Sequence, residues 1–391
     1  MKILWLCSWY PHSTDRYDGD FIERHAKALS EFQKVDVIHI VQNTSLLTNE
    51  TYRTEKHTEK NLQTQIVYVP VPNTPFATLT TALFNRRYYR QMLDTLKEYS
   101  EQNGVPDLVH VHVPVKMGAA ALWLKRKFSV PFVVTEHSNI YHNRAEEESF
   151  STYSPYFRFI TKRVIDKADV LITVSDFLGK AINEIAGKKE YTVIPNVVDT
   201  SRFYYTENKP AHSVFRFLHV SNLYPVKNPQ LMLEVIHLFL QTDQSAEFIF
   251  IGNKTKEWEL KAAKLGIPKK SIQFMGEIPY AKVAEELKKA DALFLYSKSE
   301  TFSCVTAEAL CCGLPVVSSN VGAIPELVNK TNGILAEPEN AEALANAMLL
   351  LKKKYGQFNR KKIAEEASAK YNYSIVAQQL LSVYQKVLGK Y

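Results

Sequence analysis

Short apolar runs alternate with longer amphipathic stretches along the first half of the chain. The short runs indicate buried strands, and stretches with apolar residues three or four positions apart indicate helices. The strands are expected near residues 3–7, 35–41, 65–69, 108–112, 131–135, 170–174 and 191–194. The helices are expected near residues 20–30, 85–100, 119–128 and 156–167, and from residue 176. This order predicts βαβ units and a mostly parallel sheet.

The same pattern restarts after a polar stretch without periodicity at residues 200–213, which we expect to be a linker. The later strands are expected near residues 215–220, 247–251, 271–275, 292–296 and 315–318, with helices near 228–241, 258–265, 280–289 and 303–312. The pattern predicts an α/β protein with two doubly wound, Rossmann-like domains, at residues 1–200 and 205–372. In such sheets ligands bind outside the carboxyl ends of the strands, so we expect function in a cleft between the two domains.

Composition limits the class of protein. Apolar residues make up 46% and charged residues 23% of the 391, an ordinary balance for a soluble globular protein. The formal net charge of +7 is spread along the chain, which fits anionic ligands, and no nucleic-acid-binding motif appears. Four cysteines without framework spacing indicate a reducing, cytoplasmic location. No apolar run approaches 18 residues, so we expect any membrane contact to be peripheral.

The most informative stretch is residues 297–315, SKSETFSCVTAEALCCGLP. It places Glu300 in a loop directly after a predicted strand and Glu308 about one turn into the next helix. The first N–H groups of that helix, including those of Ser303 and Cys304, lack helical partners and carry the positive end of the helix dipole. A phosphate would satisfy them, so the stretch predicts an anion site.

Two carboxylates beside such a site suit a ligand with vicinal hydroxyls, because charged acceptors form the stronger hydrogen bonds, roughly 1.5 to 3 kcal/mol each. Glu300, before the helix, would accept from the hydroxyls of a sugar, and Glu308, inside it, from a ribose. The spacing alone is weak evidence. Its strand, loop and helix setting predicts a nucleotide-activated sugar as the ligand.

The stretch E-x7-E followed by ALCCGLPVVSSNVGAIPELV resembles the family-4 retaining glycosyltransferases, which have the GT-B fold of two Rossmann-like domains facing across a cleft. The resemblance covers nearly the whole chain. It implies that Glu300 binds hydroxyls of the donor sugar and that Glu308 binds the ribose, in agreement with the roles inferred from the residues.

The stretch VSNLYPVKNP, residues 220–229, resembles the family's segment in which an arginine and a lysine neutralise the donor diphosphate. Lys227 matches the lysine, and Asn222 stands in place of the arginine. Asn222 can donate a hydrogen bond but supplies no charge. Since charge develops on the leaving diphosphate, a fixed cation at Lys227 acts on the transition state.

In the first half, residues 10–29 resemble the family's first βα loop, whose glycine, here Gly19, lets the backbone approach the donor phosphate. Asp18 and Asp20 flank it as a DxD tripeptide, but a cap by Asp20 at the start of a helix is the better interpretation than a metal site. Thr135-Glu136-His137 resembles the family's Thr-x-His segment, which implies that His137 lies beside the donor sugar. We expect His110 and His112 to be packing residues, because no third zinc ligand stands at a recognisable spacing.

Two further regions follow from the resemblance. Residues 276–279, with Ile278, would frame the nucleotide base, and residues 373–391 would form a helix that packs back on the N-terminal domain.

Residues 76–89 and 156–163 mix aromatic and basic side chains, which suggests contact with an anionic membrane that carries a lipid-linked acceptor.

These observations predict a retaining hexosyltransferase that moves a hexose or hexosamine from a nucleoside diphosphate to the hydroxyl of a saccharide or lipid-linked acceptor, in bacterial surface polysaccharide or glycolipid synthesis. No cofactor or metal is expected, and Glu300, His137 and Lys227 are the expected catalytic residues. Two other classes stay open. One is a sugar-nucleotide epimerase or dinucleotide-dependent oxidoreductase, disfavoured because no GxGxxG follows a predicted strand. The other is a catalytically silent sugar-nucleotide-binding protein, suggested by Asn222.

Overall fold

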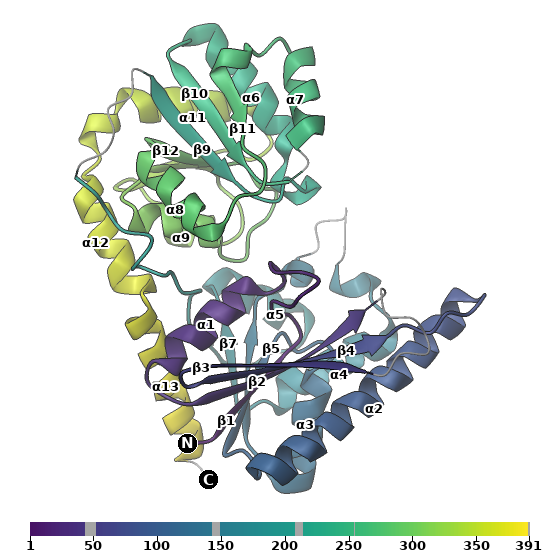
Figure 1. The fold of residues 1–391 in the computed structure, drawn as a ribbon. Helices are drawn as coiled ribbons and strands as arrows, with labels where there is room; N and C mark the ends of the chain where they lie inside the picture. Colours follow the sequence, from purple (N-terminus) through teal and green to yellow (C-terminus); the bar gives the residue numbers. More distant parts are fainter. Residues whose placement is uncertain (44–51, 143–148, 208–213, 254, 390–391) are drawn as a thin grey trace. The chain divides into compact units, whose positions relative to one another are not determined.

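The computed structural model describes residues 1–43, 52–142, 149–207, 214–253 and 255–389, which form two compact units (Figure 1). Unit 1 comprises Met1–Pro195 and Val376–Tyr391, and unit 2 comprises Asn196–Ile375. The boundary between the units lies after Pro195, slightly before the expected residue 200. The Val198 N–H donates to the Tyr371 carbonyl at 2.7 Å, which joins residue 198 to unit 2. Of the expected linker, residues 208–213 lie outside the described residues.

Unit 1 is built on an eight-stranded sheet in the order β3-β4-β2-β1-β5-β6-β7-β8. The strands are β1 (Ile3–Cys7), β2 (Val35–Asn43), β3 (Arg53–Glu59), β4 (Leu62–Pro70), β5 (Leu108–His112), β6 (Phe132–Glu136), β7 (Val170–Thr173) and β8 (Tyr191–Val193). All neighbours pair in parallel except β3, which runs antiparallel to β4. The strand order reverses between β1 and β5, so the loops after these two strands diverge.

Helices cover both faces of this sheet. They are α1 (Asp20–Ser30), α2 (Ala77–Asn103), α3 (Gly118–Phe128), α4 (Pro155–Lys167), α5 (Asp176–Ile185) and α13 (Tyr373–Leu388), with short 3-10 turns at Asn139–Tyr141 and Phe150–Thr152. Helices α1 and α13 lie on one face and α2, α3 and α4 on the other (Figure 1). The Tyr384 hydroxyl of α13 lies 2.5 Å from Nδ1 of His110 in β5, which fastens the C-terminal helix to the sheet.

Strand β3 was not predicted from the sequence. Its residues, RTEKHTE, are polar throughout, and six of the seven side chains are exposed. Because β3 lies at the sheet edge and pairs only with β4, it needs no apolar face to form. Helix α2 is also longer than the expected 85–100, since its first two turns are largely exposed and show no apolar periodicity.

Unit 2 has a six-stranded, fully parallel sheet in the order β11-β10-β9-β12-β13-β14. The strands are β9 (Phe215–Val220), β10 (Ala246–Ile251), β11 (Ile272–Phe274), β12 (Ala292–Leu295), β13 (Val316–Ser319) and β14 (Gly333–Ala336). Relative to chain order this is 3-2-1-4-5-6, the doubly wound arrangement, and the order reverses between β9 and β12.

The helices of unit 2 also form two layers. They are α6 (Pro229–Thr242), α7 (Thr255–Lys264), α8 (Tyr280–Lys289), α9 (Cys304–Cys311), α10 (Ile324–Leu327), α11 (Ala341–Lys353) and α12 (Arg360–Tyr371), with 3-10 turns at Pro225–Lys227, Lys269–Ser271 and Tyr355–Gln357. Helix α11 packs on α6 on one face, and α12 packs on α9 on the other (Figure 1). In the part of the chain that the structure covers, none of the helices has the length and apolar character that a membrane span requires.

Candidate functional site

The strand order of unit 2 reverses between β9 and β12, and the loops after these strands carry three of the residues singled out in the sequence. Asn222 and Lys227 follow β9, and Glu300 follows β12. The Lys298 N–H donates to the Val226 carbonyl at 2.8 Å, which joins the two loops. Asn222 is exposed, whereas Lys227 is half-buried. The fold therefore gathers these residues where open α/β sheets bind their ligands.

Lys227 and Glu300 contact each other directly. The Lys227 ammonium donates to Oε1 of Glu300 at 2.6 Å, and the Ser297 hydroxyl donates to the same oxygen at 2.6 Å. The Glu300 side chain is only 8% exposed, against 24% for Lys227. Among the described residues no hydrogen bond reaches Oε2, so that oxygen is available to a ligand hydroxyl. The sequence predicted both charged residues but not Ser297, whose only signal is its place after a strand.

Gly322 positions the backbone of Glu300. The Ala323 N–H donates to the Glu300 carbonyl at 2.9 Å, and Gly322 has a φ of 55°. A Cβ at Gly322 would lie 2.2 Å from the Glu300 carbonyl oxygen, so this position excludes any side chain. Gly322 belongs to the segment VSSNVGAIPELV that carries the resemblance, but the sequence did not indicate that it touches Glu300.

Helix α9 begins at Cys304, one residue later than expected, and Ser303 is its N-cap with a φ of 74°. The Ser303 hydroxyl makes no bond to the helix backbone and lies instead 2.8 Å from the hydroxyl of Thr306. The first-turn N–H groups of α9 thus receive no cap from the Ser303 side chain. Next to them, Nδ2 of Asn196 contacts the sulfur of Cys304 at 3.5 Å.

Glu308 lies in the second turn of α9 and is 4% exposed. The Tyr280 hydroxyl donates to its Oε1 at 2.6 Å. Tyr280 is the first residue of α8 and directly follows residues 276–279, so this bond brings the half-buried Ile278 and Glu308 into one neighbourhood. Tyr280 was not predicted, because its 28-residue separation from Glu308 leaves no local signal.

In unit 1, Gly19 stands at the N-terminus of α1 with a φ of 60°. A Cβ there would lie 2.6 Å from the backbone carbon of Trp9, so only glycine fits. Asp20 does not cap α1, contrary to our expectation. Gly19 holds the N-cap position, and the Asp20 carboxylate pairs with Arg24 at 2.8 Å.

His137 directly follows β6 and is 6% exposed. Its Nε2 lies 3.3 Å from Nδ1 of His112, and its ring contacts Phe21. The Glu136 carboxylate accepts from the N–H groups of His137 and Ser138, each at 2.8 Å, and from the Tyr141 hydroxyl. Burial raises the pKa of Glu136 to about 7, although these donors favour its charged form. Glu136 therefore fixes the turn that presents His137.

His110 and His112 lie on the same face of β5 and are fully buried. Burial lowers the pKa of each well below the usual histidine value, so both rings are neutral at pH 7. His110 hydrogen-bonds Tyr384 and, through Nε2 at 2.6 Å, Thr135. Within the described ranges, the side chains grouped closely enough to share a metal ion are others, namely His12, Asp18 and His39.

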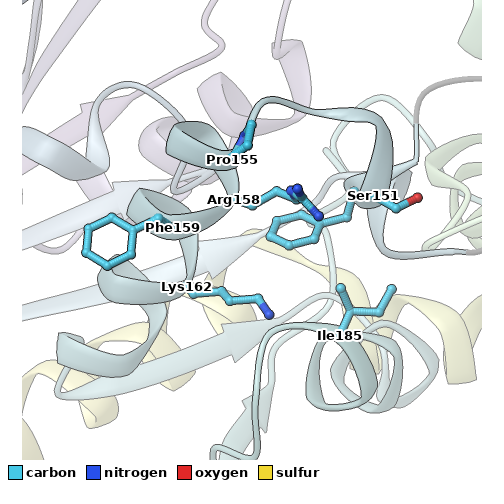
Figure 2. A pocket seen from close by; sticks show the side chains of 7 residues that line it. Ser151, Pro155, Arg158, Phe159, Lys162 and Ile185 are labelled. Atoms are coloured by element: carbon cyan, nitrogen blue, oxygen red, sulfur yellow. The ribbon is translucent and has the colours of Figure 1, made fainter.

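A cavity of about 450 Å³ lies beside α4 in unit 1. Figure 2 shows Arg158 and Lys162 extending from α4 toward Ser151 and Ile185, while Phe159 points away from them. Phe159 and its neighbour Tyr156 are both 60% exposed. A hydrogen bond between Tyr89 and Tyr156 joins α2 to α4, so the two aromatic and basic segments noted in the sequence meet here.

Two family models match the chain, one in each half. Residues 206–370 match the family described as "Glycosyl transferases group 1", and residues 26–202 match the family described as "Glycosyltransferase Family 4". Together the two models cover most of both units.

Relatives and solved structures agree with these models. The chain is 27% identical over 366 residues to a putative teichuronic acid biosynthesis glycosyltransferase, TuaC, of Bacillus subtilis, covering 89% of this chain and 88% of TuaC. It resembles a sucrose-phosphate synthase structure from Thermosynechococcus elongatus with a TM-score of 0.79 at 18% identity, over 100% of both chains. It also resembles Anabaena HepE in complex with UDP-glucose with a TM-score of 0.72 at 17% identity, over 99% of this chain and 100% of HepE.

Proposed function

The chain belongs to the group 1 glycosyltransferases with the GT-B fold, as the sequence resemblance predicted, and we propose that it moves a hexose or hexosamine from a nucleoside diphosphate to an acceptor hydroxyl with retention of the anomeric configuration. We propose this donor because each of its groups has a charged residue in unit 2 that suits it. Lys227 suits the diphosphate, Glu300 the sugar and Glu308 the ribose. HepE, a structural relative, was solved with UDP and with UDP-glucose, which supports a nucleotide sugar.

The contact between Lys227 and Glu300 carries this proposal. The Lys227 ammonium and the Glu300 carboxylate lie 2.6 Å apart. A ligand that binds both side chains therefore presents two neighbouring groups, one to each of them. In a nucleotide sugar the sugar hydroxyls and the adjoining phosphate are such neighbours. Lys227 then faces the phosphate and Glu300 the sugar, whereas Glu308, held by Tyr280, accepts from the ribose hydroxyls.

The reaction breaks the bond between the anomeric carbon and the phosphate oxygen and forms a bond from the acceptor oxygen to the same face of that carbon. Negative charge grows on the leaving diphosphate, where the Lys227 ammonium and the first N–H groups of α9 stabilise it. The acceptor proton passes to the leaving phosphate, so no separate base is required. In this proposal, as the family resemblance implies, His137 orients the sugar and Gly19 lets the backbone approach the donor phosphate.

The acceptor class is proposed from the surface of unit 1 and from one relative. The cavity beside α4 presents Arg158 and Lys162, and the exposed ring of Phe159 projects from the same helix in another direction (Figure 2); basic and aromatic side chains on one exposed helix suit an anionic lipid headgroup. The relative TuaC is named for teichuronic acid biosynthesis. We therefore favour a lipid-linked or saccharide acceptor of a bacterial surface polysaccharide or glycolipid, at the cytoplasmic face of a membrane.

Transfer is tested by incubating the purified protein with UDP, GDP and ADP sugars and a saccharide acceptor mixture. We expect one donor class to raise the melting temperature by mass action and to be turned over to the free nucleoside diphosphate. Proton NMR of the product should show the donor's anomeric configuration. An inverted product excludes retention, and donor binding without turnover of any acceptor or water indicates a silent sugar-nucleotide-binding protein.

Membrane contact is tested by liposome co-sedimentation at low salt. Binding to anionic vesicles should exceed binding to neutral ones, and the double variant Arg158→Ala, Lys162→Ala should reduce it. The control, Lys361→Ala with Lys362→Ala on α12, removes the same charge from an exposed site in unit 2. Equal binding to anionic and neutral vesicles, or equal loss in both double variants, contradicts the contact.

A further inference from the structure

We propose that unit 1 binds a divalent transition-metal ion of the Zn²⁺ class through His12, Asp18 and His39. One ligand atom from each residue lies within 4.8 Å of the other two. Nε2 of His12 is 3.7 Å and Nε2 of His39 is 3.9 Å from Oδ2 of Asp18. Nitrogen and oxygen ligands about 2.1 Å from a tetrahedral Zn²⁺ lie roughly 3.3 Å apart, so small side-chain movements would close the site.

The surroundings of His39 orient its ring as a metal ligand. It is 1% exposed, and its Nδ1 donates to the Cys7 carbonyl at 2.8 Å, because a carbonyl can only accept. This bond fixes the tautomer in which Nε2 carries the lone pair, and among the residues that the structure describes that buried Nε2 has no hydrogen-bond partner. Metal-binding histidines are oriented in the same way, by a second nitrogen that donates to a carbonyl. Nε2 of His39 lies 3.9 Å from the Asp18 carboxylate, so the two groups can share one cation.

The other two ligands lie in the loop of residues 8–19. His12 is held by paired backbone bonds with Asp15, and its Nδ1 lies 2.8 Å from the Thr14 hydroxyl, which leaves Nε2 toward Asp18. The Asp18 carboxylate is 27% exposed.

The site differs from the DxD arrangement considered from the sequence. The two aspartates beside Gly19 separate, since Asp20 pairs with Arg24 while Asp18 lies with the two histidines. Two imidazoles and one carboxylate favour Zn²⁺ over Mg²⁺, which prefers oxygen ligands. The ion would tie the loop of residues 8–19 to β2, and no step of the reaction requires it.

The positive charge of Lys116 competes with a metal ion for the Asp18 carboxylate. It interacts electrostatically with both Asp18 and His39. In the metal-free protein Lys116 supplies the positive charge near Asp18 that the ion would replace. Replacing Lys116 by an uncharged residue should therefore strengthen metal binding. A histidine cluster with a purely structural role would show no such gain in metal affinity.

The test is titration calorimetry of the chelator-treated full-length protein with Zn²⁺ and, separately, Mg²⁺. We expect one Zn²⁺ per chain and no detectable Mg²⁺ binding. Asp18→Asn and His39→Gln should each weaken Zn²⁺ binding at least about 100-fold, because each removes a ligand. Lys116→Met should tighten it. His57→Ala, at an exposed histidine of β3, should match the wild type.

Hydrogen exchange keeps the test informative should a variant be unstable. Zn²⁺ should slow exchange of amides 8–19 in the wild type and in His57→Ala but not in Asp18→Asn. We expect Asp18→Asn to fold normally, because asparagine has the shape of aspartate and the side chain at this position is partly exposed. No Zn²⁺ binding by the wild type, or binding that survives both Asp18→Asn and His39→Gln, overturns the proposal.

Discussion

The two units share a doubly wound, mostly parallel sheet but carry different side chains near the point where the strand order reverses. In unit 2 the loops after β9 and β12 carry a lysine and a glutamate in contact, Lys227 and Glu300, with Glu308 nearby in α9. In unit 1 the end of β5, beside the reversal, carries the buried, neutral ring of His112, and the neighbouring strand β6 is followed by the buried ring of His137. Topology thus selects the location of a site, and side chains decide what it binds. Fixed charge suits a diphosphate, whereas neutral imidazoles suit sugar hydroxyls.

Both regions also depend on a glycine that no other residue can replace. Gly322 in unit 2 and Gly19 in unit 1 have positive φ angles, and a Cβ on either would meet backbone atoms. In each case the glycine lets two backbone segments approach closely. The comparison indicates that charge, not loop geometry, separates the two regions, and the following variants test this.

The largest effect is expected from the charged groups of unit 2. Lys227→Ala and Glu308→Ala should each lower kcat/KM about 100-fold, through loss of roughly 2 to 3 kcal/mol of charged contacts to the donor. Steady-state transfer assays measure this, with Lys330→Ala as an exposed control in the same unit. Near-wild-type transfer by both variants would overturn the site assignment.

A smaller effect is expected from Gly322→Ala, whose Cβ would displace the Glu300 carbonyl. We expect the unfolding free energy to fall by about 2 kcal/mol and kcat/KM to fall about tenfold. The matched control is Gly266→Ala, which has a similar positive φ of 72° but nothing within 4 Å of the added Cβ. If denaturant titration and kinetics show equal losses in both variants, Gly322 acts through backbone strain alone.

His137→Gln should lower kcat about tenfold, since one neutral hydrogen bond to the sugar contributes about 1 kcal/mol. Binding of the nucleoside diphosphate alone, measured by calorimetry, should stay unchanged because the charged groups are in unit 2. A matching loss of nucleotide affinity would show that the roles of the two regions are not separate.

The smallest effect concerns pH. The pKa of His110 and His112 is lowered by burial, so the unfolded chain binds more protons than the folded one below about pH 6.5, and stability falls on acidification. Glu136, with a pKa raised to about 7, acts oppositely between about pH 4.5 and 7.

Hydrogen exchange at pH 7 and pH 5.5 should therefore show a greater loss of protection in β5 than in β9, whose single buried histidine, His219, also has a lowered pKa of about 4. Glu136→Gln should steepen the decline in melting temperature with acidification, because it removes the opposing group. A flatter decline in that variant contradicts the assigned direction.

Sequence reasoning predicted the buried strands and the strand, loop and helix around Glu300 and Glu308, whereas the roles of the two glutamates stay predictions. Strands such as β1 and β12 are continuous apolar runs, because both faces of a parallel sheet are covered. The two glutamates were recognised because strand, loop and helix follow one another within a short segment. Strand β3 was missed, since an edge strand with exposed faces carries no apolar alternation.

The sequence by itself determined the doubly wound class of both halves and the chemical types available at the candidate site, since periodicity and helix termini are local properties of the chain. Only the tertiary structure decided which side chains meet. Lys227 reaches Glu300 across 73 positions, Tyr280 reaches Glu308 across 28, and His39 lies beside Asp18. Such contacts depend on strand order and loop closure, which bring distant residues together without leaving a pattern between them.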